Sequence, residues 1–172
     1  MSHQNVKMLS MKFLISACLL GDRVRYDGQH AAQQYLQQLL QQQQVIKICP
    51  EQAGGLATPR AAAEIVGGDG SDVLNARARV LDCEGVDVSA AFVKGAYLTL
   101  QLAQYHQVTH IVLKSKSPSC GTAHIYDGHF RGQLRSGAGV TAALLQQHGF
   151  EVWDEQSFWQ YLTTQGLAWL AE

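Results

Sequence analysis

The residues best suited to chemistry in this sequence are its four cysteines, Cys18, Cys49, Cys83 and Cys120. They are spread along the chain and no two of them form a CxxC pair, so the sequence holds no local metal-binding motif. In a reducing compartment a disulfide framework is not expected. Each cysteine is therefore a buried apolar side chain, a reactive thiol or a metal ligand, and its place in the fold decides which.

Short apolar runs predict the strands that position three of these cysteines. The predicted strands are Lys12–Ser16, Val45–Cys49, His110–Lys114 and a short fourth strand at Phe150–Trp153. Apolar residues at helical spacing predict the helices between and after them, which are His30–Gln44, a helix from Asp87 or Ser89 to Gln107, Gly139–Gln147 and Gln156–Leu170. Strands and helices thus alternate along most of the chain.

Three segments do not follow this alternation. Residues 50–60 contain Gly54, Gly55 and Pro59 and are predicted to form a loop. The segments Ala62–Val66 and Ala76–Asp82 flank a glycine-rich stretch and suggest a hairpin. The serine-rich and glycine-rich stretch of residues 115–137 is predicted to lack regular structure.

The alternation predicts an α/β protein, a three-layer Rossmann-like or flavodoxin-like parallel sheet with helices on both faces, in a single domain. Ligands of such sheets bind beyond the carboxyl ends of the strands. If the strand order begins 2-1-3, Cys18, Cys49 and Cys120 converge at one edge, although they are 31 and 71 residues apart in sequence. Cys83 lies in the predicted hairpin, where we expect a buried structural thiol.

Three converging thiolates suit a metal centre with an open position. The two candidates are a zinc ion that also binds water, and an iron–sulfur cluster in which one iron lacks a protein ligand. Three buried structural thiols are the alternative, because free cysteine is among the most buried residue types. A zinc site would need a histidine, and His124 and His129 are the histidines near Cys120.

Composition limits the class of protein. Hydrophobic residues make up 47% of the chain and charged residues only 16%, with a formal net charge of −1. This balance argues against a nucleic-acid partner, which would require a strongly basic face. No apolar run approaches the length of a membrane span, so we expect a cytoplasmic protein without a membrane partner.

Five blocks of sequence resemble the thiouracil desulfidase family. They are ISACLLGDRVRYDG (15–28), CPEQAGGLATPR (49–60), LKSKSPSCG (113–121), IYDGHFRG (125–132) and GAGVTAALL (137–145). The resemblance covers about residues 11–155. It sets residues 1–10 apart as an N-terminal extension from one desulfidase-like α/β domain over residues 11–172, and Cys83 does not belong to the pattern.

The resemblance implies a [4Fe-4S] cluster held by Cys18, Cys49 and Cys120, with one open iron that binds the sulfur of a thiolated pyrimidine base or nucleotide. A soft thiocarbonyl sulfur prefers a soft iron–sulfur centre, which would polarise the carbon–sulfur bond. The implied activity is hydrolytic: water replaces the sulfur and yields a uracil-type product and hydrogen sulfide. The alternative is a non-catalytic iron–sulfur or nucleotide-binding sensor module.

Two further residues are implied in catalysis. Glu51 follows Cys49 by two residues and would serve as general acid and base. Its alternative role is to cap a loop amide or to pair with Arg60. Ser117, in the loop before Cys120, would orient the base or water, although serines in such loops often only satisfy turn amides.

Basic residues near these loops are candidates for binding a substrate phosphate. They are Arg25, Arg60 and Lys114, and the backbone N–H groups of Gly54 and Gly55 are expected to add to this anion site. The alternative is a structural role, with Arg25 paired to Asp27 and Arg60 paired to Glu64. Tyr26 and Tyr126 are expected to anchor turns or to stack on a base.

Overall fold

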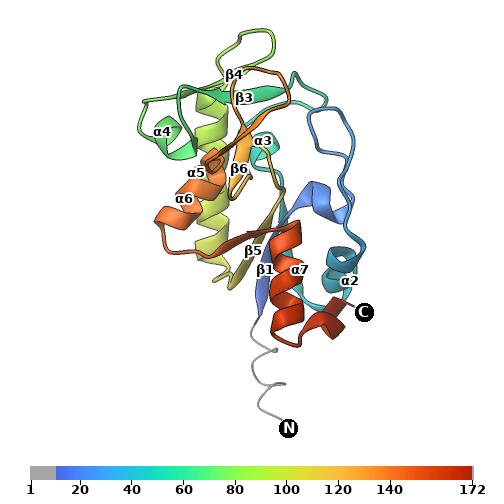
Figure 1. Cartoon of the computed structure of the whole chain (residues 1–172). Helices are drawn as coiled ribbons and strands as arrows, with labels where there is room; N and C mark the ends of the chain where they lie inside the picture. The colour runs from blue at the N-terminus through green and yellow to red at the C-terminus, as the bar shows by residue number, and fades with distance from the viewer. Residues whose placement is uncertain (1–10, 172) are drawn as a thin grey trace.

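The computed structural model describes residues 11–171, and the predicted N-terminal extension lies outside these described residues. Four strands form the central sheet: β1 (Lys12–Ser16), β2 (Gln44–Ile48), β5 (His110–Leu113) and β8 (Val152–Asp154). All pairs are parallel, in the order β2-β1-β5-β8. The predicted parallel sheet and its 2-1-3 start are therefore confirmed (Figure 1).

Helices cover both faces of this sheet. Helices α5 (Ser89–Tyr105) and α6 (Val140–Gln147) pack on one face, and α2 (Gln34–Gln42) and α7 (Glu155–Thr164) lie on the other (Figure 1). Successive side chains of a strand point to opposite faces. Accordingly Leu14 of β1 joins the core under α5 and α6, whereas Phe13 and Ile15 join the core under α2 and α7. The three predicted layers follow from this alternation.

Two helices are shorter than the sequence pattern predicts. Helix α2 begins at Gln34 rather than at His30. The C-terminal helix α7 ends at Thr164, and a separate 3-10 helix, η2 (Ala168–Ala171), follows. Gly166 adopts φ +67° between them, a left-handed conformation that ends an α-helix.

The irregular segments contain more structure than predicted. Residues 50–60 begin with a short helix, α3 (Pro50–Ala53), because a proline is well suited to the first helical position. The predicted hairpin is present as antiparallel strands β3 (Ala63–Val66) and β4 (Arg79–Asp82), with helix α4 (Gly70–Leu74) between them. A second hairpin, β6 (His124–Tyr126) and β7 (Leu134–Ser136), occupies the stretch predicted to be irregular.

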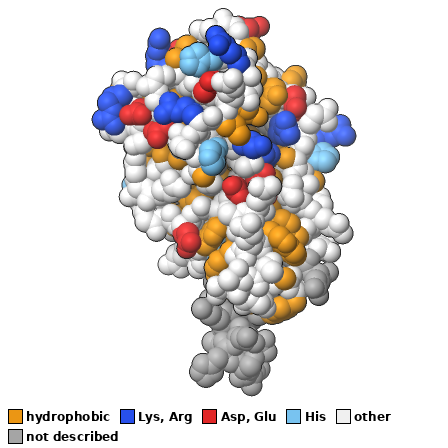
Figure 2. Space-filling view, in the orientation of Figure 1, with side chains coloured by type: hydrophobic (Ala, Val, Ile, Leu, Met, Phe, Trp, Pro, Cys, Tyr) orange, Lys and Arg blue, Asp and Glu red, His pale blue; other side chains and the backbone are white. Residues whose placement is uncertain are grey.

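Both hairpins lie beyond the end of the sheet at which β1 and β5 terminate (Figure 1). On the face seen in Figure 2, charged side chains gather mostly on this half of the molecule, and the basic and acidic ones are interspersed. No helix within residues 11–171 is long and apolar enough to cross a bilayer. The carboxyl ends of the strands thus face a polar region built from loops and hairpins.

Candidate metal centre and active site

A cavity of about 590 Å³ opens at the carboxyl end of the sheet. Cys18 enters its lining from the 3-10 helix η1 (Ala17–Leu20) that follows β1, Cys49 directly follows β2, and Cys120 lies in the loop after β5. The strand order therefore brings three thiols from three loops to one cavity, as expected. Its volume is within the range of small-molecule sites.

The three thiols differ in their exposure to water. Cys18 and Cys120 are buried and Cys49 is partly buried. Burial, together with the nearby Cys49, raises the pKa of Cys18 to about 12, and burial also raises the pKa values of Cys49 and Cys120. Ser16 Oγ donates a hydrogen bond of 3.6 Å to Cys120 Sγ. Burial thus favours the neutral thiols, and a bound cation would favour the thiolates.

The donor set fits a cluster better than a single ion. Within residues 11–171, no three His, Cys, Asp or Glu side chains lie close enough together to hold one metal ion. His129 pairs with Asp127, and neither His129 nor His124 belongs to the described lining of the cysteine cavity. The histidine that a zinc site would need is therefore missing from this lining. In a [4Fe-4S] cluster each cysteine binds a different iron, so its thiolates lie further apart than the ligands of a single ion.

Glu51 also lines the cavity, and its position follows from the short helix α3. It lies in the first turn of this helix, directly after Cys49 and Pro50. Arg60 contacts one of its oxygens, with Nε 2.7 Å and Nη2 2.6 Å from Glu51 Oε2. The other oxygen, Oε1, accepts no hydrogen bond from the residues that the structure describes. The ion pair therefore orients the carboxylate and leaves one oxygen available to the cavity.

Arg60 is fully occupied by the protein itself. Besides Glu51, its guanidinium donates to Ala57 O, to Thr58 Oγ1 and to Val24 O. The alternative pairing of Arg60 with Glu64 is wrong, because Arg60 pairs with Glu51 instead. The alternative pairing of Arg25 with Asp27 is confirmed, at 3.3 Å. Both arginines line the cavity with their charges already paired.

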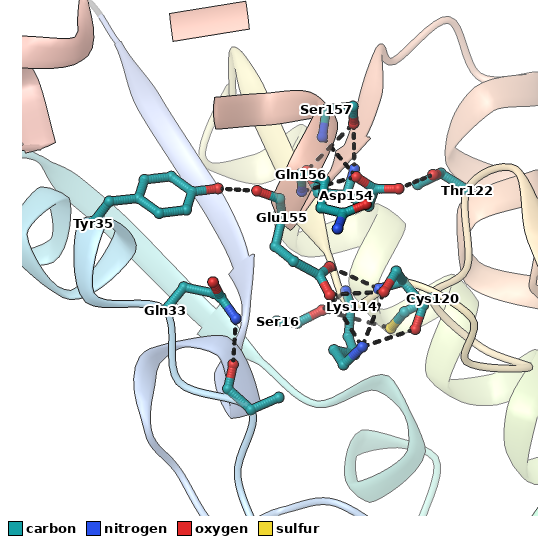
Figure 3. A network of polar contacts seen from close by, with 12 residues as sticks. Ser16, Gln33, Tyr35, Lys114, Cys120, Thr122, Asp154, Glu155, Gln156 and Ser157 are labelled. Atoms are coloured by element: carbon teal, nitrogen blue, oxygen red, sulfur yellow. Dashed lines mark hydrogen bonds and ion pairs between the residues drawn. The ribbon is translucent and has the colours of Figure 1, made fainter. Parts of the chain in front are cut away.

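The third expected cation, Lys114, belongs to a network centred on Glu155 (Figure 3). Lys114 Nζ lies 3.1 Å from Glu155 Oε1. Ser115 donates its backbone N–H to Oε2 at 2.9 Å and its hydroxyl to Oε1 at 2.7 Å. Glu155 is the first residue of α7, so this carboxylate ties the loop after β5 to that helix.

The serines near Cys120 mostly organise its loop. Ser117 Oγ accepts hydrogen bonds from Ser119 N at 3.1 Å and Cys120 N at 3.2 Å, while Ser117 also lines the cavity. Ser119 is buried and bonds to Thr141. The Ser117 hydroxyl proton has no acceptor within residues 11–171, so it can point to a ligand while its oxygen holds the turn.

Two glycines and one cysteine lie apart from the cavity lining that the structure describes. Gly54 N donates to Pro50 O and Gly55 N to Gln52 O, each at 2.9 Å. These N–H groups, expected to bind an anion, are used within the chain. Cys83 is exposed, so the expectation that it is a buried thiol is wrong. It follows the edge strand β4 in a turn that faces solvent.

Sequence reasoning missed three residues that shape this site, Ser16, Phe130 and Glu155, and it gave a fourth, Glu64, the wrong partner. Ser16 and Glu64 are buried polar side chains in strands, where a polar residue within an apolar run is the available signal. Phe130 lines the cavity from the β6–β7 loop. The residues next to Glu155 in the sequence do not indicate its role, because its partners Ser115 and Lys114 are 40 and 41 residues away.

Comparison with known proteins identifies relatives over most of the chain. The family 2-thiouracil desulfurase matches residues 13–157. The uncharacterized protein YbbK of Bacillus subtilis (strain 168) is 44% identical over 142 residues, which are 83% of this chain and 94% of YbbK. The solved structure of the [4Fe-4S]-dependent thiouracil desulfidase TudS is 39% identical, with a TM-score of 0.80, and the match covers 92% of this chain and 99% of TudS.

Proposed function

The chain belongs to the 2-thiouracil desulfurase family, and on that premise we propose that it removes sulfur from thiolated uracil with the help of a [4Fe-4S] cluster. The observation that carries the proposal is the cavity itself, lined by three thiols and by the Glu51 carboxylate. The relative of solved structure is a [4Fe-4S]-dependent thiouracil desulfidase, which supports the same conclusion.

Cys18, Cys49 and Cys120 are the proposed ligands. Three ligands for four irons leave one iron open, and such a centre would supply a soft Lewis acid that polarises the carbon–sulfur bond. The protein has to exclude water from the remaining irons. The burial of Cys18 and Cys120 supports this role, as does the Ser16 hydroxyl that bonds to Cys120 Sγ.

Glu51 is the proposed acid and base of a hydrolytic reaction. Its Oε1 would take a proton from water as the water oxygen bonds to the ring carbon, and would return the proton to the ring nitrogen or to the departing sulfur. In balance, the thiocarbonyl compound and water become the carbonyl compound and hydrogen sulfide. Arg60 holds the carboxylate in place, and Ser117 would orient the base or the water.

The proposal covers the free thiolated base and its nucleotide. Arg25, Arg60 and Lys114 all line the cavity and are the candidates for contact with a phosphate. Each of them pairs with a carboxylate of the protein, and this pairing reduces the positive charge that a phosphate would meet. The pairing of these three residues favours the free base.

The test is turnover by anaerobically reconstituted protein. We expect 2-thiouracil to lose its thiocarbonyl absorbance and to yield uracil and sulfide in equal amounts. A protein that holds iron and sulfide but releases no product would favour the sensor alternative. Reconstituted protein that holds one zinc ion and no acid-labile sulfide would contradict the cluster and the mechanism together.

A further inference from the structure

Phe130 is a large apolar side chain that the fold places in the lining of the cysteine cavity although it remains 40% exposed. It belongs to the loop of residues 127–133 between β6 and β7. An exposed aromatic ring at a cavity wall has apolar surface that a ligand would cover. Neither the metal ligands nor the proposed acid and base account for it.

The backbone of Phe130 is held in a strained conformation. Its φ is +55°, in the left-handed region that bulky side chains rarely adopt. Such strain persists only where neighbouring contacts enforce it, and it is concentrated at binding sites. The contacts that enforce it here are specific and come mainly from one carboxylate.

That carboxylate belongs to Glu64 in β3, which is only 8% exposed. Glu64 Oε2 accepts hydrogen bonds from Gly128 N at 2.8 Å and from Phe130 N at 3.1 Å. No Lys or Arg within residues 11–171 forms an ion pair with it, so the two backbone amides are what satisfy this buried carboxyl group. Glu64 therefore fixes the loop at the residue that bears the ring.

The loop is also docked closely on the strand that carries Glu64. A Cβ on Gly128 would lie 2.5 Å from Ile65 O, so a larger residue there would push the loop away from β3. Asp127 N donates to Gln133 O at 3.0 Å and closes the base of the loop. The position of the Phe130 backbone is thus determined by β3 as well as by the β6–β7 hairpin.

We propose that Phe130 binds substrate by stacking on the planar pyrimidine ring, and that Glu64 is the positioning residue that holds it there. The inference rests on the proposed function, because it assumes a thiolated base in this cavity. Stacking on an aromatic face recognises the ring and not the position of the sulfur. Phe130 would therefore select planar ring substrates over saturated ones and contribute little to the choice between 2-thio and 4-thio bases.

The test compares 2-thiouracil with its 5,6-dihydro analogue, whose ring is not planar, in cluster-loaded protein. Phe130→Ala and Phe130→Leu should raise the KM for 2-thiouracil about 5- to 100-fold, as expected for loss of base stacking, and should abolish the preference over the dihydro analogue. Phe130→Tyr should restore the preference. Tyr105→Ala, which removes an exposed ring outside the cavity, is the control and should leave both KM values unchanged.

Glu64 is tested by a conservative pair of variants. Glu64→Gln keeps an oxygen that accepts hydrogen bonds from the two amides, so it should retain the preference for 2-thiouracil over the dihydro analogue. Glu64→Ala should lose this preference. The double variant Glu64→Ala/Phe130→Ala should show no larger rise in KM than Phe130→Ala alone. If Glu64→Gln lowers kcat strongly with KM unchanged, Glu64 transfers protons and the positioning role is wrong. If Glu64→Ala does not fold, the Phe130 variants still test stacking, and Glu64→Gln still distinguishes positioning from proton transfer.

Binding of uracil, measured by calorimetry, gives a readout that requires no chemistry. Its affinity should fall in Phe130→Ala and not in Tyr105→Ala. An unchanged affinity, together with an unchanged KM for 2-thiouracil, would overturn the inference while the proposed function stands. A wild-type protein that holds the cluster but releases no sulfide would instead overturn the proposed function, and uracil binding would still test Phe130.

Discussion

Glu51 is anchored on one side and open on the other. Arg60 bonds to Oε2, and the arginine is itself held by Val24 O, Ala57 O and Thr58 Oγ1. A carboxylate fixed in this way loses little freedom when it engages a substrate, which is what general acid–base catalysis requires. Its place directly after Cys49 and Pro50 keeps it next to the proposed cluster without making it a ligand.

Glu51→Gln should separate binding from catalysis. The variant keeps the size of the side chain but cannot shuttle a proton, so we expect a normal iron content and a desulfidation rate lowered by roughly 10²- to 10⁴-fold. Ser117→Ala should cost less, because it removes one hydroxyl from the turn. Loss of thiocarbonyl absorbance is measured together with iron on the same samples.

The matched control for Glu51 is Glu84→Gln, which neutralises an exposed glutamate outside the cavity lining and should keep the wild-type rate. A cluster-loaded Glu51→Gln protein that works near the wild-type rate would make Glu51 structural. The proton would then have to come from another group.

At the scale of the elements, α3 is positioned by direct backbone contact with α5. A Cβ on Gly95 would lie 1.9 Å from Pro50 O, and a Cβ on Gly54 would lie 2.0 Å from Ala91 O. Only glycine allows the two helices to approach this closely. Since α3 carries Glu51 and directly follows Cys49, this contact determines where two of the proposed site residues lie.

Gly95→Ala should therefore destabilise the protein, although alanine is ordinarily the better helix residue by about 1 kcal/mol. Forcing α3 away from α5 should cost about 1–3 kcal/mol in the free energy of unfolding, as overpacking does. Equilibrium urea unfolding of the cluster-free protein measures this cost. Gln101→Ala, at an exposed position of the same helix, should change it little, and a stabilised Gly95→Ala protein would show that the contact is not tight.

A second contact between elements is expected to make the free energy of unfolding depend on pH. His110 of β5 packs among aromatic rings, with Trp153 stacked at 5.6 Å and Phe13 at 5.2 Å. Burial lowers the pKa of His110 below its ordinary value of 6.5. As the pH falls below that value, the unfolded chain takes up the proton first, so the free energy of unfolding decreases until folded His110 is protonated as well.

His110→Phe should remove this dependence while keeping a ring in the cluster. Urea unfolding of cluster-free protein, in steps from pH 7.5 downward, gives the free energy of unfolding of both proteins. The wild-type value minus the variant value should decline as the pH falls below about 6.5. A difference that does not change with pH would mean that His110 titrates alike in the folded and unfolded states.

The sequence predicts the main elements well where hydrophobic periodicity is strong. The four sheet strands and helix α5 follow from it, and the parallel order then predicts the convergence of Cys18, Cys49 and Cys120. Helix α4 was missed because it has five residues and is stabilised by the Asp69 capping box rather than by an apolar stripe. The β6–β7 hairpin was missed because Glu64, distant in sequence, docks its loop.

At the scale of the whole molecule, the sheet separates two hydrophobic cores. The polar residues of the proposed site lie beyond the carboxyl ends of its strands, at one end of the sheet. Both hairpins lie at that end, so they enclose the cavity with residues far apart in sequence. Arg25, Arg60 and Lys114 are each paired with a carboxylate at this end of the sheet, whereas Lys116 lines the cavity without an ion pair among the described residues. The sequence could not show the pairing of Lys114 with Glu155, because 41 residues separate them.

This pairing bears on the form of the substrate. A free phosphate site would lower the KM for 2-thiouridine monophosphate well below that for 2-thiouracil, since a hydrogen bond to a charged group contributes about 1.5–3 kcal/mol. Because Arg25, Arg60 and Lys114 are paired, we expect the two KM values to agree within a few-fold. A KM for the nucleotide that is lower by more than tenfold would show that basic residues of the cavity lining, with Lys116 among them, bind the phosphate.

The central claim is that three cysteines from three loops hold one cluster, and metal analysis of cysteine variants tests it most directly. Wild-type protein and Cys83→Ala, reconstituted anaerobically, should each hold about four iron and four sulfide ions per chain. Cys18→Ala, Cys49→Ala and Cys120→Ala should each lose the cluster, because two ligands from distant loops do not retain it. Full iron and sulfide in any of these three variants, or loss of both in Cys83→Ala, would contradict the assignment.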